Sequence, residues 1–219
     1  MLESPSVQAQ QTSATNGNVS IRLQGLDGKY TQILKDGFPL YGGFAQGLSI
    51  MQIPPLDLKQ IEIVKGSASS LYGSDAIAGI INLVSKTPSE KREFNILLNQ
   101  TSLYGNNADL YYSKKWKKFG LSFFSSNNFQ SAVDVNGDGF SDVAYTRSYN
   151  VSPTLFYQID TFTTIRFALN GLWENRKGGD MHVITKSLDS MHTFFESNES
   201  NRLSSQFKFE KKFDKNILT

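Results

Sequence analysis

Cysteine is absent from the 219 residues of this chain. Its absence excludes disulfides, iron–sulfur clusters, cysteine zinc sites and thiol catalysis, and it suits a protein that passes through an oxidising compartment. The chain has only two histidines, and no nucleophile–base–acid set is evident, because a hydrolase needs a histidine in ordered surroundings. The sequence therefore disfavours an enzyme.

No single sign of charge dominates the sequence. The 22 Lys and Arg are scattered among 20 Asp and Glu, which gives a formal net charge of +2. So small and dispersed a charge argues against a nucleic-acid-binding surface, and we expect no nucleic-acid partner. The hydrophobic fraction of 39%, with 12% aromatic residues, predicts that the chain folds.

Long hydrophobic runs are also missing. No segment approaches the roughly 18 to 20 apolar residues of a membrane-spanning helix. Residues 1–10 lack the apolar middle of a signal peptide, so an exported protein would have its natural beginning upstream. Transmembrane strands stay possible, because their hydropathy signal is much weaker than that of helices.

Two kinds of sequence meet near Pro88. Before it, short apolar runs are punctuated by glycine, and the Asp36-Gly37 pair favours a two-residue hairpin. This part predicts a small α+β domain with four or five strands and two brief helices. The expected strands cover residues 19–25, 30–35, 38–41, 61–65 and 80–85, and the expected helices cover residues 56–58 and 67–71. A short apolar run over residues 50–53 ends at Pro54-Pro55.

After Pro88, polar and apolar residues alternate over long segments. The alternation is cleanest over residues 149–159, where one face of the strand is apolar and the other polar. We expect six complete strands, with a seventh beginning at Ile217. The six cover residues 94–103, 110–116, 121–129, 149–159, 163–173 and 203–213.

The lengths of the connections between these strands add a second regularity. Short turns near residues 118–119, 160–161 and 214–215 alternate with loops over residues 104–107, 131–147 and 178–200. Short turns at one end and long loops at the other are typical of an outer-membrane β-barrel. A soluble β-sandwich also has alternating strands, but it rarely sorts its connections by end.

Two stretches before Pro88 resemble the plug domain of TonB-dependent outer-membrane receptors. They read VSIRLQGLDGKYTQILKDGFPLYGG and IPPLDLKQIEIVKGSASSLYGSDAIAGIINLVSKTP. The resemblance covers about residues 6–88, with one departure at Ser67, where the family usually has proline. It implies a plug domain over residues 1–88, without its N-terminus, followed over residues 89–219 by the first six to seven antiparallel transmembrane-type strands of a barrel of about 22.

The resemblance also implies a function in the bacterial outer membrane. Members of the family take up a nutrient such as a metal chelate, including siderophores, a vitamin or a glycan, and the plug occludes the barrel and contributes to binding. The implied partners are the nutrient, outer-membrane lipid and the energy-transducing TonB complex, whose binding segment we expect to be absent here. An incomplete barrel cannot transport by itself.

By the same resemblance, two plug loops over residues 11–18 and 41–46 grip the ligand. Their aromatic and amide side chains suit an amphipathic ligand, although simple loop packing is the alternative for each residue. The candidate substrate-binding residues are Gln11, Asn16, Tyr41, Phe44 and Gln46.

Three charged residues interrupt apolar strands of the plug: Arg22, Glu62 and Lys65. We expect them to meet the polar lumen of the barrel. The alternative is an ion pair within the plug, and in both cases the charges need partners once water is excluded.

A loop after the third barrel strand has oxygen-bearing residues at alternate positions. The candidate calcium ligands are Asp134, Asn136, Asp138, the Phe140 carbonyl and Asp142, with glycine at the sixth place. Tyr145 stands where an EF-hand has its bidentate glutamate, so the motif is incomplete, and a solvated acidic turn is the alternative. A calcium-stabilised surface domain that binds carbohydrate or protein, without transport, is the second hypothesis for function.

The next long loop repeats a Met-His pair, at Met181-His182 and at Met191-His192. Such pairs could capture a soft metal. Two histidines in a loop are more often incidental, so we assign no metal site there.

Overall fold

We describe a computed structural model of the chain, in which residues 7–11, 13, 19–40, 55–67, 76–186 and 188–213 can be described. The chain forms two compact units. One comprises Met1–Lys86, Ser131–Tyr145 and Arg176–Ser197, and the other comprises Thr87–Gln130, Thr146–Asn175 and Asn198–Thr219. Among the described residues, no helix has the length and apolar character needed to cross a membrane.

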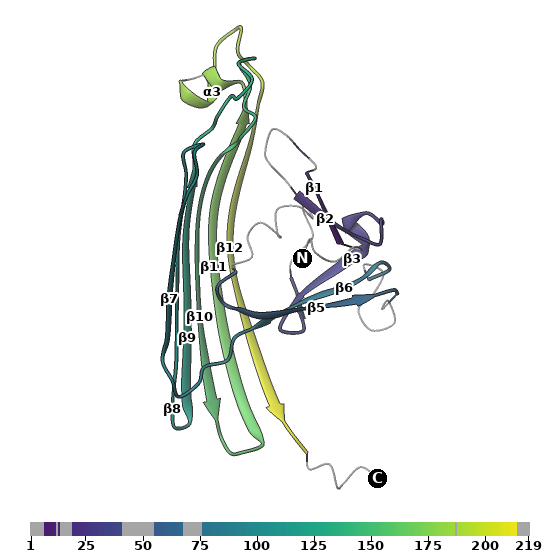
Figure 1. Cartoon of the computed structure of the whole chain (residues 1–219), viewed down its shortest axis with the longest axis vertical. Coiled ribbons are helices and arrows are strands. Elements are labelled where there is room, and N and C mark those ends of the chain that lie inside the picture. The colour runs from purple at the N-terminus through teal and green to yellow at the C-terminus, as the bar shows by residue number, and fades with distance from the viewer. Residues whose placement is uncertain are drawn as a thin grey trace. The chain divides into compact units, whose positions relative to one another are not determined.

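The first unit contains two small sheets (Figure 1). Strand β1 (Val7–Gln11) pairs antiparallel with β2 (Val19–Leu23). A four-stranded sheet has the order β4-β3-β6-β5, in which only the β3–β6 pair is parallel. Its strands are β3 (Thr31–Lys35), β4 (Phe38–Pro39), β5 (Leu58–Lys65) and β6 (Gly79–Ser85).

The hairpin predicted at Asp36-Gly37 joins β3 to β4. Asp36 and Gly37 have φ angles of 55° and 84°, the positive values that this turn requires. The Asp36 carboxylate accepts hydrogen bonds from the backbone N–H and the hydroxyl of Ser85, both at 2.8 Å. The turn is therefore confirmed, and its first residue also fastens the hairpin to the end of β6.

The core of the first unit lies between β1, β2 and β6. Val7, Ile21, Leu23, Ile81 and Leu83 are each at most 5% exposed. Alternate residues of a strand point to the same face, so Ile21 and Leu23, like Ile81 and Leu83, contribute to one apolar layer. The sequence analysis did not predict β1, whose Val7 is part of this core.

The second kind of sequence forms one antiparallel sheet of six strands (Figure 1). The spatial order β12-β11-β10-β9-β8-β7 follows the chain without a crossover, which confirms the predicted run of antiparallel strands. The strands are β7 (Glu93–Gln100), β8 (Gly105–Trp116), β9 (Phe119–Gln130), β10 (Tyr145–Gln158), β11 (Thr163–Gly179) and β12 (Phe195–Lys211).

Several strands of this sheet are longer than the alternation predicted. Strand β11 continues to Gly179 and β12 begins at Phe195, so the loop between them is shorter than expected. Backbone hydrogen bonds between strands do not depend on apolar side chains, so pairing continues through polar sequence. The hydrophobic pattern therefore marks only part of several strands, such as β11 and β12.

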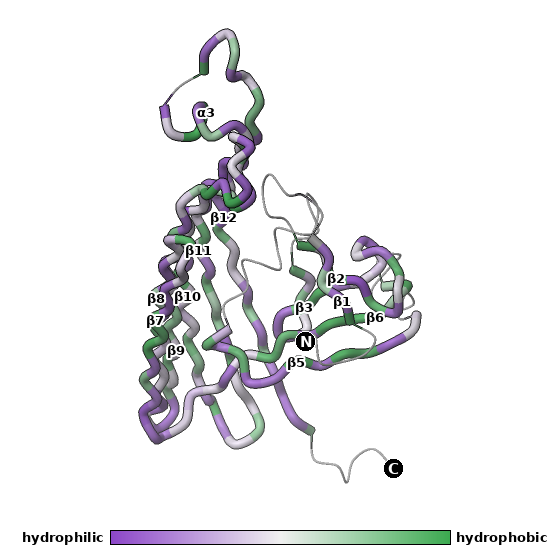
Figure 2. Tube along the Cα trace, turned by 45° about the horizontal axis from the view of Figure 1, so that its top comes forward, coloured by the Kyte–Doolittle hydropathy of each residue, from purple (hydrophilic) through white to green (hydrophobic). Residues whose placement is uncertain are grey.

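The six-stranded sheet exposes many of its apolar side chains and shelters many polar ones, although Tyr111, Phe124 and Leu172 are buried. In β10, Leu155 and Tyr157 are 41% and 48% exposed, whereas Asn150, Ser152 and Thr154 are at most 9% exposed. Figure 2 shows hydrophobic and hydrophilic residues alternating along these strands. This polarity is opposite to that of a soluble protein, in which the apolar face of a strand is buried.

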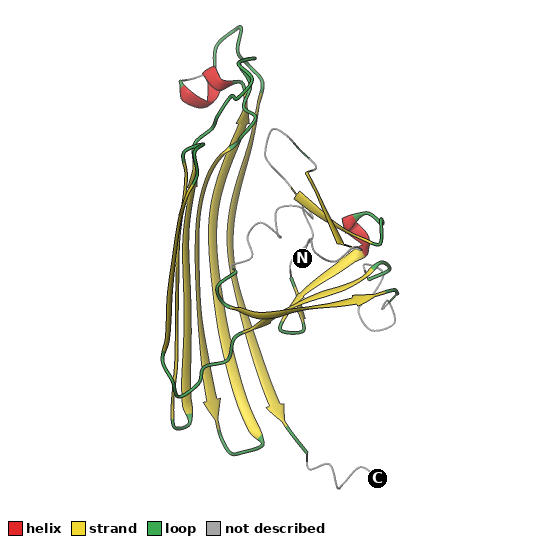
Figure 3. Ribbon diagram, in the orientation of Figure 1, coloured by secondary structure: helices red, strands yellow, loops and turns green. Residues whose placement is uncertain are grey.

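Helix is scarce in the described part of the chain (Figure 3). It comprises a 3-10 turn, η1 (Gly28–Tyr30), and a five-residue helix, α3 (Met181–Thr185). The turn expected at residues 56–58 is confirmed in part: residues 56–57 form a turn closed by the Leu58 N–H, which donates to the Pro55 carbonyl at 3.3 Å, but Leu58 already belongs to β5. Asp57 is also tied to neighbouring strands by the Lys35 ammonium at 2.6 Å and by the Lys86 N–H, which donates to its carbonyl at 2.7 Å. The apolar run over residues 50–53 and residues 68–71 of the second expected helix lie outside the described residues.

Candidate ligand and metal sites

Most of the predicted ligand-binding residues lie outside the described part of the chain. These are Asn16, Tyr41, Phe44 and Gln46. Gln11 is the last residue of β1, where its backbone pairs with Val19. The predicted grip on a ligand by these loops stays a prediction.

The three charged residues predicted for the plug surface lie on two different sheets. Arg22 is a half-buried residue of β2, whereas Glu62 and Lys65 are exposed residues of β5. Glu62 and Lys65 are three positions apart, so their side chains point to opposite faces of the strand. These three residues therefore form no common site, and their contact with a barrel lumen stays a prediction.

Glu62 has neutral partners. Its carboxylate accepts hydrogen bonds from the amide groups of Gln60 at 2.7 Å and Asn82 at 2.9 Å. The bond from Asn82 is the main cause that lowers the pKa of Glu62 below its ordinary value, and the bond from Gln60 adds to it. An ion pair within this unit joins Lys35 to Asp57 instead, at 2.6 Å. No sequence motif could have identified that pair, because the partners are 22 positions apart.

The predicted calcium loop is folded onto its own backbone. The Asp134 carboxylate accepts from the N–H groups of Gly137 at 2.7 Å and Gly139 at 2.8 Å. Asp138 accepts from the Phe140 N–H at 2.8 Å, and Asp142 accepts from the Val135 N–H at 2.8 Å. These contacts occur in a solvated acidic turn as well as in a metal loop, so the calcium site stays a prediction.

The loop over residues 131–144 is joined to the loop over residues 180–194. The Ser141 N–H donates to the Gly179 carbonyl at 2.8 Å, and the Gly179 N–H donates to the Ser141 hydroxyl at 2.9 Å. The Met181 N–H, at the start of α3, donates to the Gly139 carbonyl at 2.9 Å. The first turn of α3 is therefore fixed by a neighbouring loop as well as by its own chain.

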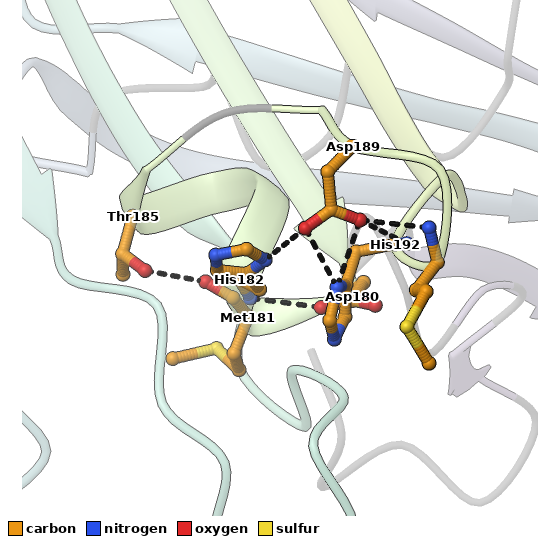
Figure 4. Close-up of polar contacts among 7 residues, drawn as sticks. Asp180, Met181, His182, Thr185, Asp189 and His192 are labelled. Carbon is orange, nitrogen blue, oxygen red and sulfur yellow. Dashed lines mark hydrogen bonds and ion pairs between the residues drawn. The ribbon is translucent and has the colours of Figure 1, made fainter.

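A cluster that the sequence analysis did not assign lies in the second of these loops. His182, Asp189 and His192 place one potential ligand atom each within 4.8 Å of one another. The imidazole Nδ1 of His192 is 3.0 Å from Asp189 Oδ1, and the Nδ1 of His182 is 3.2 Å from Asp189 Oδ2 (Figure 4). The repeated Met-His pair was the available signal, but its spacing alone could not show that the two rings meet.

Comparison with known proteins identifies the family. Residues 1–80 match the family model of the TonB-dependent receptor plug domain. The vitamin B12 transporter BtuB of Vibrio vulnificus (strain YJ016) is 30% identical over 164 residues, which are 73% of this chain and 25% of that protein. The chain thus spans about a quarter of the length of this curated relative.

Solved structures share the fold at low identity. The copper transporter OprC matches 94% of this chain and 31% of its own, with a TM-score of 0.71 and 17% identity. The ferric enterobactin receptor PfeA matches 78% of this chain and 30% of its own, with a TM-score of 0.65 and 16% identity. The chain therefore belongs to the TonB-dependent receptors, a family of bacterial outer-membrane proteins.

Proposed function

We propose that the chain is the plug and the first barrel strands of a receptor that takes up a scarce nutrient across the outer membrane. In this proposal residues 1–88 form an α+β plug, and residues 89–219 form the first strands of the barrel. TonB, the nutrient and outer-membrane lipid are the partners. The plug would obstruct a wide barrel until the nutrient arrives.

The reversed polarity of the six-stranded sheet carries this proposal. Leu155, Tyr157 and Trp173 are 41%, 48% and 47% exposed, whereas Ser152 and Thr154 on β10 are sheltered. A face of aromatic and aliphatic side chains is costly in water but stable against lipid tails, and the opposite polar face suits a solvated lumen. A soluble carbohydrate- or protein-binding domain gives no reason for this arrangement, and no relative named above supports it.

The names of the relatives indicate several classes of nutrient and do not single out one. Their names mention vitamin B12, copper and ferric enterobactin. We therefore propose a metal chelate, a metal ion or a vitamin as the nutrient, and none of these names supports a glycan.

Uptake by the receptor that contains this chain tests the function. It would be expressed in Gram-negative cells that lack their own receptors for vitamin B12 and ferric siderophores, with and without TonB. We expect accumulation of one labelled nutrient only when both the receptor and TonB are present. Equal accumulation without the receptor, or without TonB, would contradict the proposal.

We also propose that the loop over residues 134–142 binds calcium as a stiffening ion. Asp134, Asp138 and Asp142 supply carboxylate oxygens in a loop that Gly137 and Gly139 bend through positive φ angles of 78° and 88°.

Calorimetric titration of the chain with Ca²⁺ should give a dissociation constant of about 10⁻⁴ to 10⁻³ M, the range of extracellular calcium modules. The Asp134→Asn, Asp138→Asn variant should lose the signal, whereas Asp160→Asn, in a turn at the other end of the sheet, should retain it. Absence of Ca²⁺ binding by the unchanged chain would show that the loop is an acidic turn.

A further inference from the structure

Both histidines of the chain meet in the loop between β11 and β12, although they are ten positions apart in the sequence. Their ring centroids are 4.3 Å apart and the rings are nearly perpendicular, with an interplanar angle of 72°. The Asp189 carboxylate lies against both rings (Figure 4). Its Oδ2 atom is 3.2 Å from His182 Nδ1 and 3.1 Å from His192 Nδ1. His192 Nδ1 is also 3.0 Å from Oδ1, so the two imidazole nitrogens face one carboxylate group.

These separations match the edges of a metal coordination sphere. Two ligand atoms held about 2.0 to 2.1 Å from a tetrahedral zinc ion lie about 3.3 Å apart. In addition, His182 Nδ1 is shielded from solvent and has no hydrogen-bond partner among the described residues, although it is close to Asp189. A shielded nitrogen that approaches a carboxylate without hydrogen-bond geometry needs another partner. A cation between the two atoms would satisfy both.

The backbone fixes the carboxylate in place. The N–H groups of Met191 and His192 donate to Asp189 Oδ1 at 2.8 Å and 2.7 Å, and Oδ2 accepts neither of these two backbone bonds. These two bonds therefore hold the carboxylate in one orientation before any ion binds.

The histidine on α3 is also held before any ion arrives. The Asp180 carboxylate caps the helix by accepting from the His182 N–H at 2.8 Å. The Asp180 N–H donates to the Phe194 carbonyl at 2.9 Å, which links the helix to the chain just after His192. Ligands fixed in this way lose little conformational freedom on binding, so more of the interaction energy appears as affinity.

We propose that His182, Asp189 and His192 form a binding site for one divalent transition-metal ion of the zinc and copper(II) class. Two imidazoles and one carboxylate favour such an ion over calcium, which takes six to eight oxygens. Three protein ligands leave a fourth position of a tetrahedral ion open to water or to a donor atom of another molecule. Met191 is 86% exposed, so we assign no ligand to its thioether and propose a nitrogen and oxygen site. This site is distinct from the calcium loop and does not depend on transport.

Calorimetric titration of the untagged 219-residue chain with Zn²⁺ tests the site. We expect one ion per chain. His182→Ala, His192→Ala and Asp189→Asn should each weaken binding by at least about tenfold, because each removes one of three ligands. Asp189→Asn is the matched change, since it keeps the shape of the side chain and removes its charge.

Two control variants separate this site from a thioether site and from the calcium loop. Met191→Leu should bind Zn²⁺ like the unchanged chain, and so should the Asp134→Asn, Asp138→Asn variant of the calcium loop. Co²⁺ should bind in place of Zn²⁺ in the unchanged chain and give the visible absorption of a tetrahedral nitrogen and oxygen site. This spectrum reports on the ligands directly, so it tests the site even if a variant folds poorly. The proposal is overturned if the unchanged chain binds no Zn²⁺, if the three ligand variants bind as well as it does, or if Met191→Leu abolishes binding.

Discussion

Single side chains in this protein obtain their partners from neighbouring strands, and Glu62 is the clearest example. In the register of β5 against β6, Glu62 is directly opposite Asn82, whose amide donates to the carboxylate at 2.9 Å. Gln60 lies two positions earlier on the same strand, so its side chain is on the same face and also reaches the carboxylate. The Glu62 carboxylate, which interrupts an apolar strand, thus obtains its hydrogen bonds from neutral amide groups and not from a cation.

This arrangement predicts the titration of Glu62. Asn82→Leu should raise the pKa of Glu62 toward its ordinary value of 4.5, because the hydrogen bond from Asn82 is the largest cause of the lowered value. A lowered pKa favours the folded state above the ordinary value, and that contribution disappears as the pH falls through the folded value. NMR titration of the side-chain carboxyl measures the shift. Gln60→Leu serves as the comparison and should have the smaller effect; the reverse order would contradict this account.

At the scale of secondary structure, the hairpin of β3 and β4 depends on the Asp36 side chain, which forms hydrogen bonds to a strand outside the hairpin. Asp36 adopts a positive φ in the turn and at the same time accepts two hydrogen bonds from Ser85 at the end of β6. The turn residue therefore connects a local structure to a strand 49 positions later. A hydrogen bond to a charged group typically contributes about 1.5 to 3 kcal/mol to stability.

Loss of this connection should be visible as local opening. Asp36→Ala should speed hydrogen exchange in the peptides that cover β3 and β6 by roughly tenfold to a hundredfold, the equivalent of that free energy. Asp36→Asn keeps a side-chain oxygen and tolerates the positive φ, so it should exchange more slowly than Asp36→Ala. If both variants exchange like the unchanged chain, the bonds to Ser85 do not stabilise the sheet.

At the scale of the whole molecule, the core of the first unit and the six-stranded sheet differ in how many large apolar side chains they expose. In the first unit apolar side chains such as Leu23 and Ile81 are fully buried, whereas the sheet has Phe94 and Leu98 exposed at 55% and 76% on β7. Exposed apolar patches of this kind mark a surface that meets another apolar phase. The buried core of the first unit is typical of a protein in water, whereas the exposed apolar face of the sheet is the one that we propose meets lipid.

Fluorescence quenching distinguishes this polarity from that of a soluble sheet. In a Trp116→Phe variant, Trp173 is the remaining tryptophan and is 47% exposed on the apolar face of β11. In micelles that contain a brominated detergent, the Trp173 emission should be strongly quenched, while aqueous iodide should have little effect, because the ring would lie in the apolar phase. Strong quenching by iodide, with none by the brominated detergent, would contradict a lipid-facing sheet.

The sequence by itself determined the local structure wherever one rule of backbone or hydropathy was sufficient. Asp36-Gly37 predicted its turn because both residues tolerate positive φ. The alternation over residues 149–159 predicted β10, because the side chains of a strand alternate between two faces. The resemblance of residues 6–88 to the plug domain was confirmed by the family match over residues 1–80.

Only the tertiary structure decided which distant residues meet. Nothing in the sequence pairs Lys35 with Asp57, and alternation could not show that β11 continues to Gly179, because backbone pairing is independent of side-chain hydropathy. The sequence presented His182 and His192 as two separate loop residues. A turn of helix and the Asp189 carboxylate bring the rings to a centroid distance of 4.3 Å. The periodicity of a sequence indicates only the face of its own strand or helix on which each residue lies. A metal site depends on which residues from different positions the folded chain brings together.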